Sequence, residues 1–183
     1  MNRIIDQIPK DLNKNNIESA ISNYYGLLKN IPLKIESKNV LKMLTDLKRK
    51  KIEYGPYPNV TLFESANRIM SDLTILHGVK DLLNGCINEI DFDQYTVEFG
   101  HDNYHENDIT ATNGQIKLIG EGFNVAKSFF QSKKASALRK MRRQKKQNDK
   151  LLLIYNSDAV SDSYKPELKQ NEFHLKVSIN FSL

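Results

Sequence analysis

Hydrophobic side chains recur at helical spacing over the first fifty residues. One run of such positions follows Asn16, and a second follows Ser37. Ser and Asn are common at the N-caps of helices, and apolar residues three or four apart indicate helices that each place one apolar face against another element. The apolar positions of the two predicted helices are Ile17, Ala20, Ile21, Tyr24, Leu27 and Leu28, and Val40, Leu41, Leu44 and Leu47.

A longer helix is predicted after a proline-rich connector. Two prolines one residue apart exclude regular helix over residues 54–59. Thr61 and Glu64 then match the capping box that opens many helices, and the apolar period continues to Leu83. The residues expected to face inward are Ala66, Ile69, Met70, Leu73, Leu76, Val79 and Leu83.

The second half of the chain carries strand patterns. Residues 95–99 form a short β-run, and residues 151–155 are continuously apolar, which is typical of a strand buried on both faces. Residues 173–181 alternate apolar and polar, as a half-buried strand does. A helix rich in Lys and Arg is predicted between these strands, from a second capping box at Ser128 to about Gln147.

A β-hairpin is predicted between the first of these strands and the basic helix. Asn113-Gly114 is the strongest short-range signal of a two-residue turn, and such a turn would place Asp108 opposite Ile119. Asp108 and Glu121 would then be diagonal neighbours on the polar face, with backbones about 7 to 8 Å apart. Carboxylates at this spacing can close around one divalent cation. The alternative is an ordinary hairpin with polar side chains in solvent.

Composition limits the class of protein. The 183 residues fit one domain with a helical extension, and we place an N-terminal helical region at 1–55 and a core at 56–183. A hydrophobic content of 39% with 27% charged residues describes a soluble, polar globular protein. No apolar run approaches the roughly 20 residues of a membrane span, and no signal peptide is visible, so we expect a cytoplasmic protein. The single cysteine, Cys86, is expected to be a buried, inert thiol.

The positive charge is concentrated in the predicted basic helix. The net charge is +5, and eight basic residues lie between Lys133 and Lys146. Few acidic residues are interleaved, so this helix suits a phosphate backbone, although most charge runs are solvated helix faces. The residues expected to contact nucleic acid are Lys133, Lys134, Arg139, Lys140, Arg142 and Arg143. The sequence contains no Gly-rich phosphate loop, no nucleophile elbow and no Cys/His nucleophile pair.

The order of these elements, with the hairpin carboxylates, resembles the PD-(D/E)xK nuclease superfamily over residues 61–155. Asn107-Asp108 stands where that family has Pro-Asp, and Glu121 stands at the first position of its (D/E)-x-K. The resemblance implies an α/β (α+β) fold with a restriction-endonuclease-like core, in which helices flank a mixed central sheet. It also implies that Asp108, Glu121 and the backbone carbonyl of Phe123 bind Mg²⁺, or Mn²⁺ in its place. Glu64 matches an acidic residue that some members contribute from the first core helix.

The chain departs from this pattern at the motif lysine, where it has Phe123. Either another lysine replaces it or the activity is lost. Lys127 and Lys134 are the preferred replacements, ahead of Lys117, and Gln131 matches a glutamine that some relatives use in a similar location.

Two functions follow from the sequence. The first is a metal-dependent DNA endonuclease, of the type II restriction or genome-defence kind, which at this size would need a homodimer to cut both strands. The second is a catalytically inactive nucleic-acid-binding module of the same fold. The sequence leaves open whether DNA or RNA is preferred.

Overall fold

The computed structural model describes residues 4–29, 31, 39–100 and 107–179. The helices in this part of the chain are α1 (Ile17–Lys29), α2 (Val40–Arg49), α3 (Leu62–Leu83) and α4 (Phe130–Gln144). The strands are β1 (Asp11–Asn13), β2 (Gln94–Val97), β3 (Ile109–Thr112), β4 (Lys117–Phe123), β5 (Lys150–Asn156) and β6 (Glu172–Val177). Short 3₁₀ turns lie at Ile4–Gln7, Lys127–Phe129 and Ser157–Ala159.

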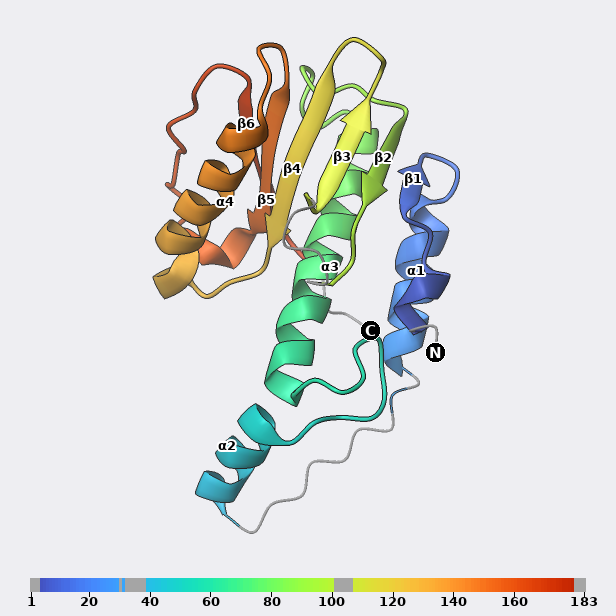
Figure 1. Ribbon diagram of the computed structural model, residues 1–183, viewed down its shortest axis with the longest axis vertical. Coiled ribbons are helices and arrows are strands. Elements are labelled where there is room, and N and C mark those ends of the chain that lie inside the picture. The colour runs from blue at the N-terminus through green and yellow to red at the C-terminus, as the bar shows by residue number, and fades with distance from the viewer. Residues whose placement is uncertain (1–3, 30, 32–38, 101–106, 180–183) are drawn as a thin grey trace.

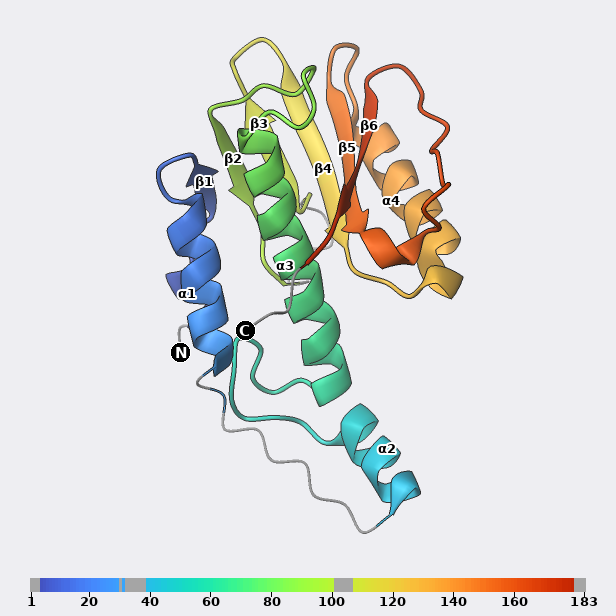
Figure 2. The same ribbon diagram turned by 180° about the vertical axis from the view of Figure 1, so that it is seen from behind.

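The fold is mixed α/β, built on a six-stranded sheet in the order β1-β2-β3-β4-β5-β6. The first four strands are antiparallel neighbours, and β4, β5 and β6 run parallel. Helix α3 packs on one face, and α4 covers β4 and β5 on the other (Figures 1 and 2). The α4 side of β2 and β3 is left as an open hollow lined by Thr96, Glu98, Thr110, Lys117, Ile119 and Gln144, together with Asn107.

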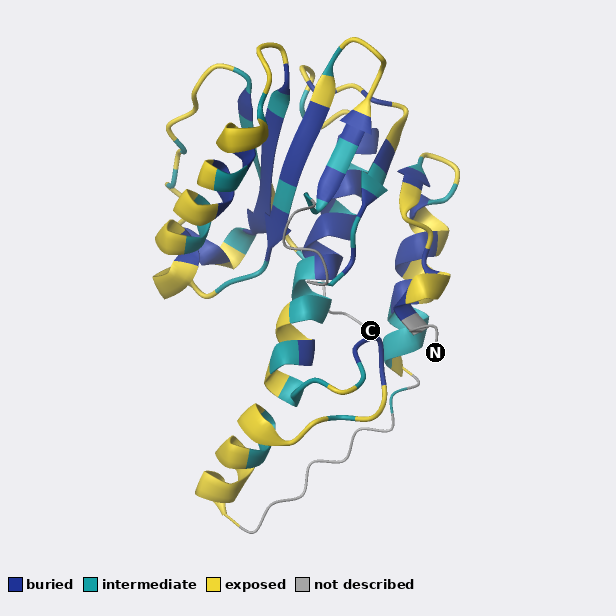
Figure 3. Cartoon of the chain, viewed as in Figure 1, coloured by how far each residue is buried: buried dark blue, intermediate teal, exposed yellow. Residues whose placement is uncertain are grey.

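The hydrophobic core lies on both faces of β5, as its apolar run predicts. Leu152 and Ile154 pack in the cluster around α3 and α1, whereas Leu151, Leu153 and Tyr155 pack in the cluster under α4. Figure 3 shows β5 and the centre of the sheet as the most continuously buried part of the molecule. Strand β6 ends at Val177, so residues 178 and 179 do not continue the predicted strand, and residues 180 and 181 lie outside the described part of the chain.

The N-terminal region contributes to the sheet as well as to the helical layer. Helix α1 begins after Asn16, as predicted, and packs on α3 with Ile17, Ala20, Ile21 and Tyr24 buried. Strand β1 was not predicted; its three residues pair with β2 at the sheet edge.

The expected packing of α2 is wrong. Its N-cap is Asn39, whose side chain accepts a hydrogen bond from the Lys42 N–H, and none of its residues is buried. Val40 and Leu41 are 68% and 76% exposed, because α2 extends away from the sheet and packs beside the start of α3 (Figures 1 and 3).

Helix α3 begins as its capping box predicts, with Thr61 Oγ1 accepting from the Glu64 N–H at 3.2 Å. Two details differ from the predicted inner face: Ala66 is exposed, and Asp72 is buried. Cys86, expected to be buried, is exposed in the turn that follows the helix. No helix among the described residues is long and apolar enough to cross a bilayer.

Candidate functional site

The β3–β4 hairpin forms as predicted, but with a longer loop. Thr112 pairs with Lys117, and Ile109 pairs with Gly120, so the loop spans residues 113–116. Asn113 Oδ1 accepts backbone N–H groups from Gln115 and Ile116, at 3.2 and 2.9 Å, and this side-chain turn holds the longer loop closed. A two-residue type I′ turn needs positive φ at both central positions, and of Asn113 and Gly114 only Gly114 has it.

This loop changes the relation between Asp108 and Glu121. The pairing shifts by two residues, which keeps every side chain on its predicted face. Continuing the register one step beyond Ile109 places Asp108 directly opposite Glu121, not diagonally. On its other side Asp108 adjoins Glu98 of the β2 end, whose N–H donates to the Asp108 carbonyl at 2.9 Å.

The two carboxylates are held by different partners. Asp108 Oδ2 accepts the Gly122 N–H at 2.9 Å. Glu121 has a side chain only 12% exposed, and Lys140 Nζ of α4 lies 2.7 Å from its Oε1. Burial and the charge of Asp108 raise the pKa of Glu121 to about 7, against the opposing effect of Lys140 and Lys133. Two like charges therefore meet at this point of the sheet, with two lysines of α4 beside them.

Phe123, which stands where the sequence resemblance implies a lysine, has a buried ring. It is 2% exposed and packs between Phe130 and Tyr155, with both pairs of ring centroids 6.3 Å apart. Lys133 Nζ lies 5.9 Å from the centre of the Phe123 ring. Helix α4 thus brings a lysine over Phe123.

The lysines preferred from the sequence lie elsewhere. Strand β4 ends at Phe123, so Lys127 is an exposed residue of a 3₁₀ turn and does not extend the strand face. Lys134 Nζ lies 3.2 Å from the Tyr164 hydroxyl, over the Phe130 and Tyr164 rings. Lys117 lines the open hollow between β2, β3 and α4.

The predicted capping box at Ser128 is wrong. With a helix start at Ser128, the sequence indicates Lys133 only as one of the expected phosphate contacts. Helix α4 begins at Phe130, after the 3₁₀ turn, and its N-cap Phe129 makes no side-chain capping bond. Gln131 is exposed in the first turn of α4. It does not line the pocket that opens beside Asp108, which is described next.

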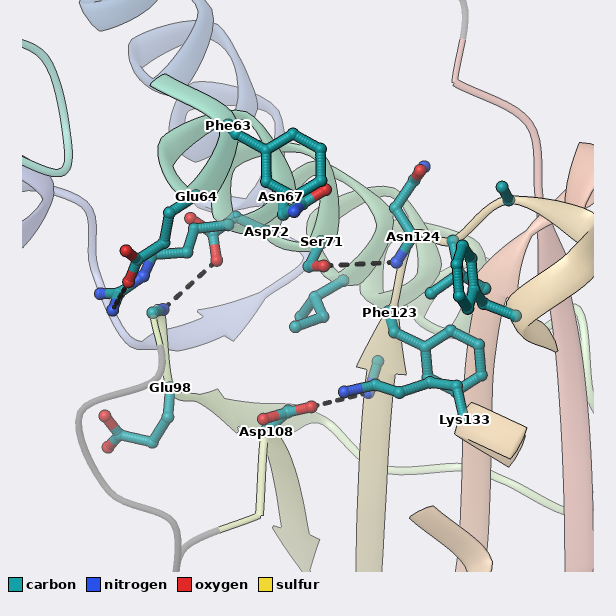
Figure 4. Close-up of a pocket in the computed structure, with 17 residues that line it drawn as sticks. Phe63, Glu64, Asn67, Ser71, Asp72, Glu98, Asp108, Phe123, Asn124 and Lys133 are labelled. Atoms are coloured by element: carbon teal, nitrogen blue, oxygen red, sulfur yellow. Dashed lines mark hydrogen bonds and ion pairs between the residues drawn. The ribbon is translucent and has the colours of Figure 1, made fainter. Parts of the chain in front are cut away.

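A pocket of about 790 Å³ opens beside Asp108, between α3 and the end of β4 (Figure 4). Asp108, Lys133 and the 122–126 segment line one side, and the first half of α3 lines the other. Glu64 also lines it, but its Oε1 is paired with Arg68 at 2.8 Å. The structure therefore places Glu64 at the pocket wall, in an ion pair of its own.

The floor of this pocket contains a buried carboxyl that the sequence did not single out. Asp72 is 2% exposed and accepts hydrogen bonds from the hydroxyls of Tyr24, at 2.6 Å, and Tyr57, and a longer one from the Gly100 N–H at 3.4 Å. Burial raises the pKa of Asp72 to about 7, although these hydrogen bonds lower it. The network joins α1, the proline-rich connector, α3 and the end of the segment after β2.

The basic residues of α4 divide into groups. Lys133 and Lys140 face Glu121, whereas Arg139 and Arg143 are exposed. Arg142 forms two hydrogen bonds to Glu172, at 2.6 and 2.7 Å, and the Glu172 side chain is only 3% exposed. Arg142 therefore serves first as the partner of a buried carboxylate.

The carboxylates of the hairpin are compatible with a divalent ion. Among the described residues, no cluster of three or more His, Cys, Asp or Glu side chains is arranged to hold a metal. Mg²⁺, however, is commonly bound through one or two carboxylates, with waters and substrate phosphates completing its shell. Asp108 and Glu121 fit that requirement, because a cation between them would relieve the repulsion that helps to raise the pKa of Glu121.

Comparison of the chain with protein-family models, curated proteins and solved structures finds no match.

Proposed function

We propose that this protein is a metal-dependent nuclease with a restriction-endonuclease-like core. The observation that carries the proposal is the β3–β4 register, which, continued by one residue, sets Asp108 opposite Glu121, with Lys133 over Phe123. The order α3-β2-β3-β4-α4-β5, with β5 parallel to β4, supports it, because it is the α-β-β-β-α-β arrangement that the sequence resemblance implies. The expected reaction is hydrolysis of a phosphodiester bond in DNA.

Asp108 and Glu121, with the backbone carbonyl of Phe123, would hold Mg²⁺ or Mn²⁺. Such an ion supplies Lewis-acid stabilisation of the phosphoryl group and lowers the pKa of a bound water. The protein contributes the geometry. The Gly122 N–H holds Asp108 just before β3, and Lys140 favours the ionised form of Glu121, which a metal ligand requires.

Lys133 takes the role of the missing motif lysine in this proposal. Its ammonium group lies over the Phe123 ring, lines the same pocket as Asp108 and lowers the pKa of Glu121. A cation there is placed to stabilise the charge that develops on the phosphate. Arg139 and Arg143, both exposed on α4, would contact phosphates farther along the strand.

A second candidate is the catalytically inactive nucleic-acid-binding module. It is favoured by the burial of Phe123, since an aromatic ring at this position can neither orient a water nor stabilise charge. The two candidates differ only in whether the site catalyses hydrolysis of the bound nucleic acid.

The experiment is cleavage of supercoiled plasmid in Mg²⁺ or Mn²⁺, with EDTA as the metal-free reference. We expect nicking by the wild type and none by Asp108→Asn or Glu121→Gln. Lys133→Met should lower the rate by about 10²- to 10³-fold, as the loss of one charge-stabilising donor does elsewhere. Lys140→Met should move the rise of activity to higher pH, because it removes a group that lowers the pKa of Glu121.

Two control variants complete the design. Glu167→Gln changes an exposed carboxyl in the segment before β6, and Lys127→Met changes the exposed lysine of the 3₁₀ turn; both should cleave like the wild type. DNA binding without cleavage by the wild type would favour the inactive module. Absence of binding at low salt would contradict both candidates. Because one Asp108–Glu121 pair cuts one strand, a homodimer belongs to the proposal, and sedimentation velocity on the complex with DNA measures it.

A further inference from the structure

The pocket beside Asp108 has aromatic side chains at its rim. Phe63 of α3 is 49% exposed and Phe129, just before α4, is 65% exposed, and both line the pocket. They come from separate walls, one on α3 and the other on the segment after β4. Large aromatic side chains exposed at a concave site are suited to a flat apolar ligand.

The pocket lining contains charged side chains and, on two of its walls, the neutral amides of Asn67 and Asn124. Asn67 lies next to Phe63 on α3, and Asn124 lies beside Ser71, whose Oγ accepts the Asn124 N–H at 3.3 Å (Figure 4). The charged groups nearby are engaged: Glu64 with Arg68, and Asp72 with Tyr24 and Tyr57. A phosphate would meet carboxylates here, whereas a neutral ring with hydrogen-bonding edges would meet amides.

Lysine side chains lie beside the aromatic groups of this site. Lys133 lines it on the α4 side, and Lys48 of α2 lies 5.7 Å from the centre of the Phe63 ring. A nucleotide suits such neighbours, because its phosphates favour cations while its base favours an aromatic surface.

We propose that this pocket binds one unpaired base of the nucleic acid strand, stacked against Phe63 and Phe129, with Asn67 and Asn124 contacting its edge. The inference rests on the proposed function, because it takes the strand held at Asp108 and Glu121 as the source of the base. The volume of about 790 Å³ lies within the range of about 300 to 1,000 Å³ that small-ligand sites occupy. The substrate class is therefore DNA with an unpaired nucleotide next to the scissile phosphodiester.

The test is fluorescence anisotropy in EDTA, so that binding is measured without cleavage. Three labelled duplexes are compared: one with a single bulged thymidine, one with a bulged abasic nucleotide, and one fully paired. Base stacking on aromatic side chains predicts that the wild type binds the thymidine bulge about 5- to 100-fold more tightly than the abasic bulge. Phe63→Leu and Phe129→Leu should each reduce that ratio, and the double variant should bring it close to one. A fourth duplex, with a single-stranded overhang in place of the bulge, shows whether the bound base comes from a strand end or is extruded from within a duplex.

Tyr54→Leu is the matched control, since Tyr54 is an exposed aromatic residue of the connector that does not line the pocket; its ratio should equal that of the wild type. Thermal unfolding of each variant shows whether the fold is kept. Equal wild-type affinity for both bulges would overturn the inference, as would a ratio that survives in the folded double variant. Plasmid cleavage is scored separately. A preference for the thymidine bulge without cleavage rejects the nuclease and supports base binding in the pocket. Cleavage without such a preference supports the nuclease and rejects base binding in the pocket.

Discussion

Asp72 and Glu121 are acidic residues in the interior whose partners differ. Glu121 has a lysine at 2.7 Å and a carboxylate neighbour, as expected of a site that binds charged groups. Asp72 has two tyrosine hydroxyls and one backbone N–H, and its network ties α1 and the connector to α3. In the proposed function Glu121 therefore takes part in the chemistry, whereas Asp72 supports the pocket.

Asp72 gives a stability prediction with a definite sign. Its pKa is raised from an ordinary value of 3.8 to about 7, so the folded protein binds this proton more tightly than the unfolded chain does. The stability that Asp72 contributes is full below the unfolded pKa and is lost as the pH rises through the folded value. Between about pH 5 and about pH 8, the free energy of unfolding of wild type relative to Asp72→Asn should fall by about 2 to 3 kcal/mol.

Urea unfolding at both pH values measures this difference. Asp162→Asn, at an exposed position, serves as the matched control and should track the wild type at each pH. A difference between wild type and Asp72→Asn that stays constant or grows with pH would show that Asp72 is ionised in the folded protein throughout.

The sequence identified the residues whose neighbours are local in the chain. Asp108 and Glu121 belong to one hairpin, and strand alternation determines their common face even when the turn length is misjudged by two residues. Asp72 could not be found in this way. Its tyrosine partners are 48 and 15 residues away, and a single aspartate in an apolar helix gives no local signal of burial.

Helix α4 supplies the charges of the proposed site, and the packing of its buried residues decides which of them face β4. Phe130, Ala137, Leu138 and Met141 pack inward, and with this face inward Lys133 and Lys140 lie toward Glu121 and Lys134 toward Tyr164. The predicted helix start at Ser128 does not show which of these lysines faces β4. The sequence therefore predicted a basic helix correctly but could not assign its individual side chains.

The division of charges on α4 predicts different effects for its arginines. Replacing both Arg139 and Arg143 by Gln should weaken DNA binding uniformly across sequences. It should also lower the slope of log affinity against log salt by about one for each phosphate that is no longer neutralised. Arg142→Gln should leave the slope unchanged. It should instead reduce stability by about 1 to 3 kcal/mol, because it leaves the buried Glu172 without its partner.

Anisotropy titrations at several salt concentrations measure the slope, and urea unfolding measures the stability. If Arg142→Gln lowered the slope as much as the Arg139 and Arg143 changes do, the pairing with Glu172 would not hold in the complex. If none of the three changed the slope, α4 would not be the phosphate-binding element.

In the whole molecule, the proposed site lies where the antiparallel and parallel halves of the sheet meet. Strand β4 pairs antiparallel with β3 and parallel with β5, and α3 and α4 cover opposite faces beside it (Figures 1 and 2). The sequence predicted this succession of elements because each has a clear hydrophobic period. It missed β1, whose three residues are too few to show one, and it misjudged α2, whose period is amphipathic although none of its residues is buried.

The most decisive measurement is Mn²⁺ binding, since it does not depend on knowing the nucleic acid substrate. Free Mn²⁺ is followed by electron paramagnetic resonance during titration of wild type, Asp108→Asn, Glu121→Gln and the exposed control Glu167→Gln. We expect one site in the wild type and in the control, weakened at least about tenfold by either change at the paired carboxylates. Equal Mn²⁺ affinity in all four proteins would contradict a metal site at Asp108 and Glu121.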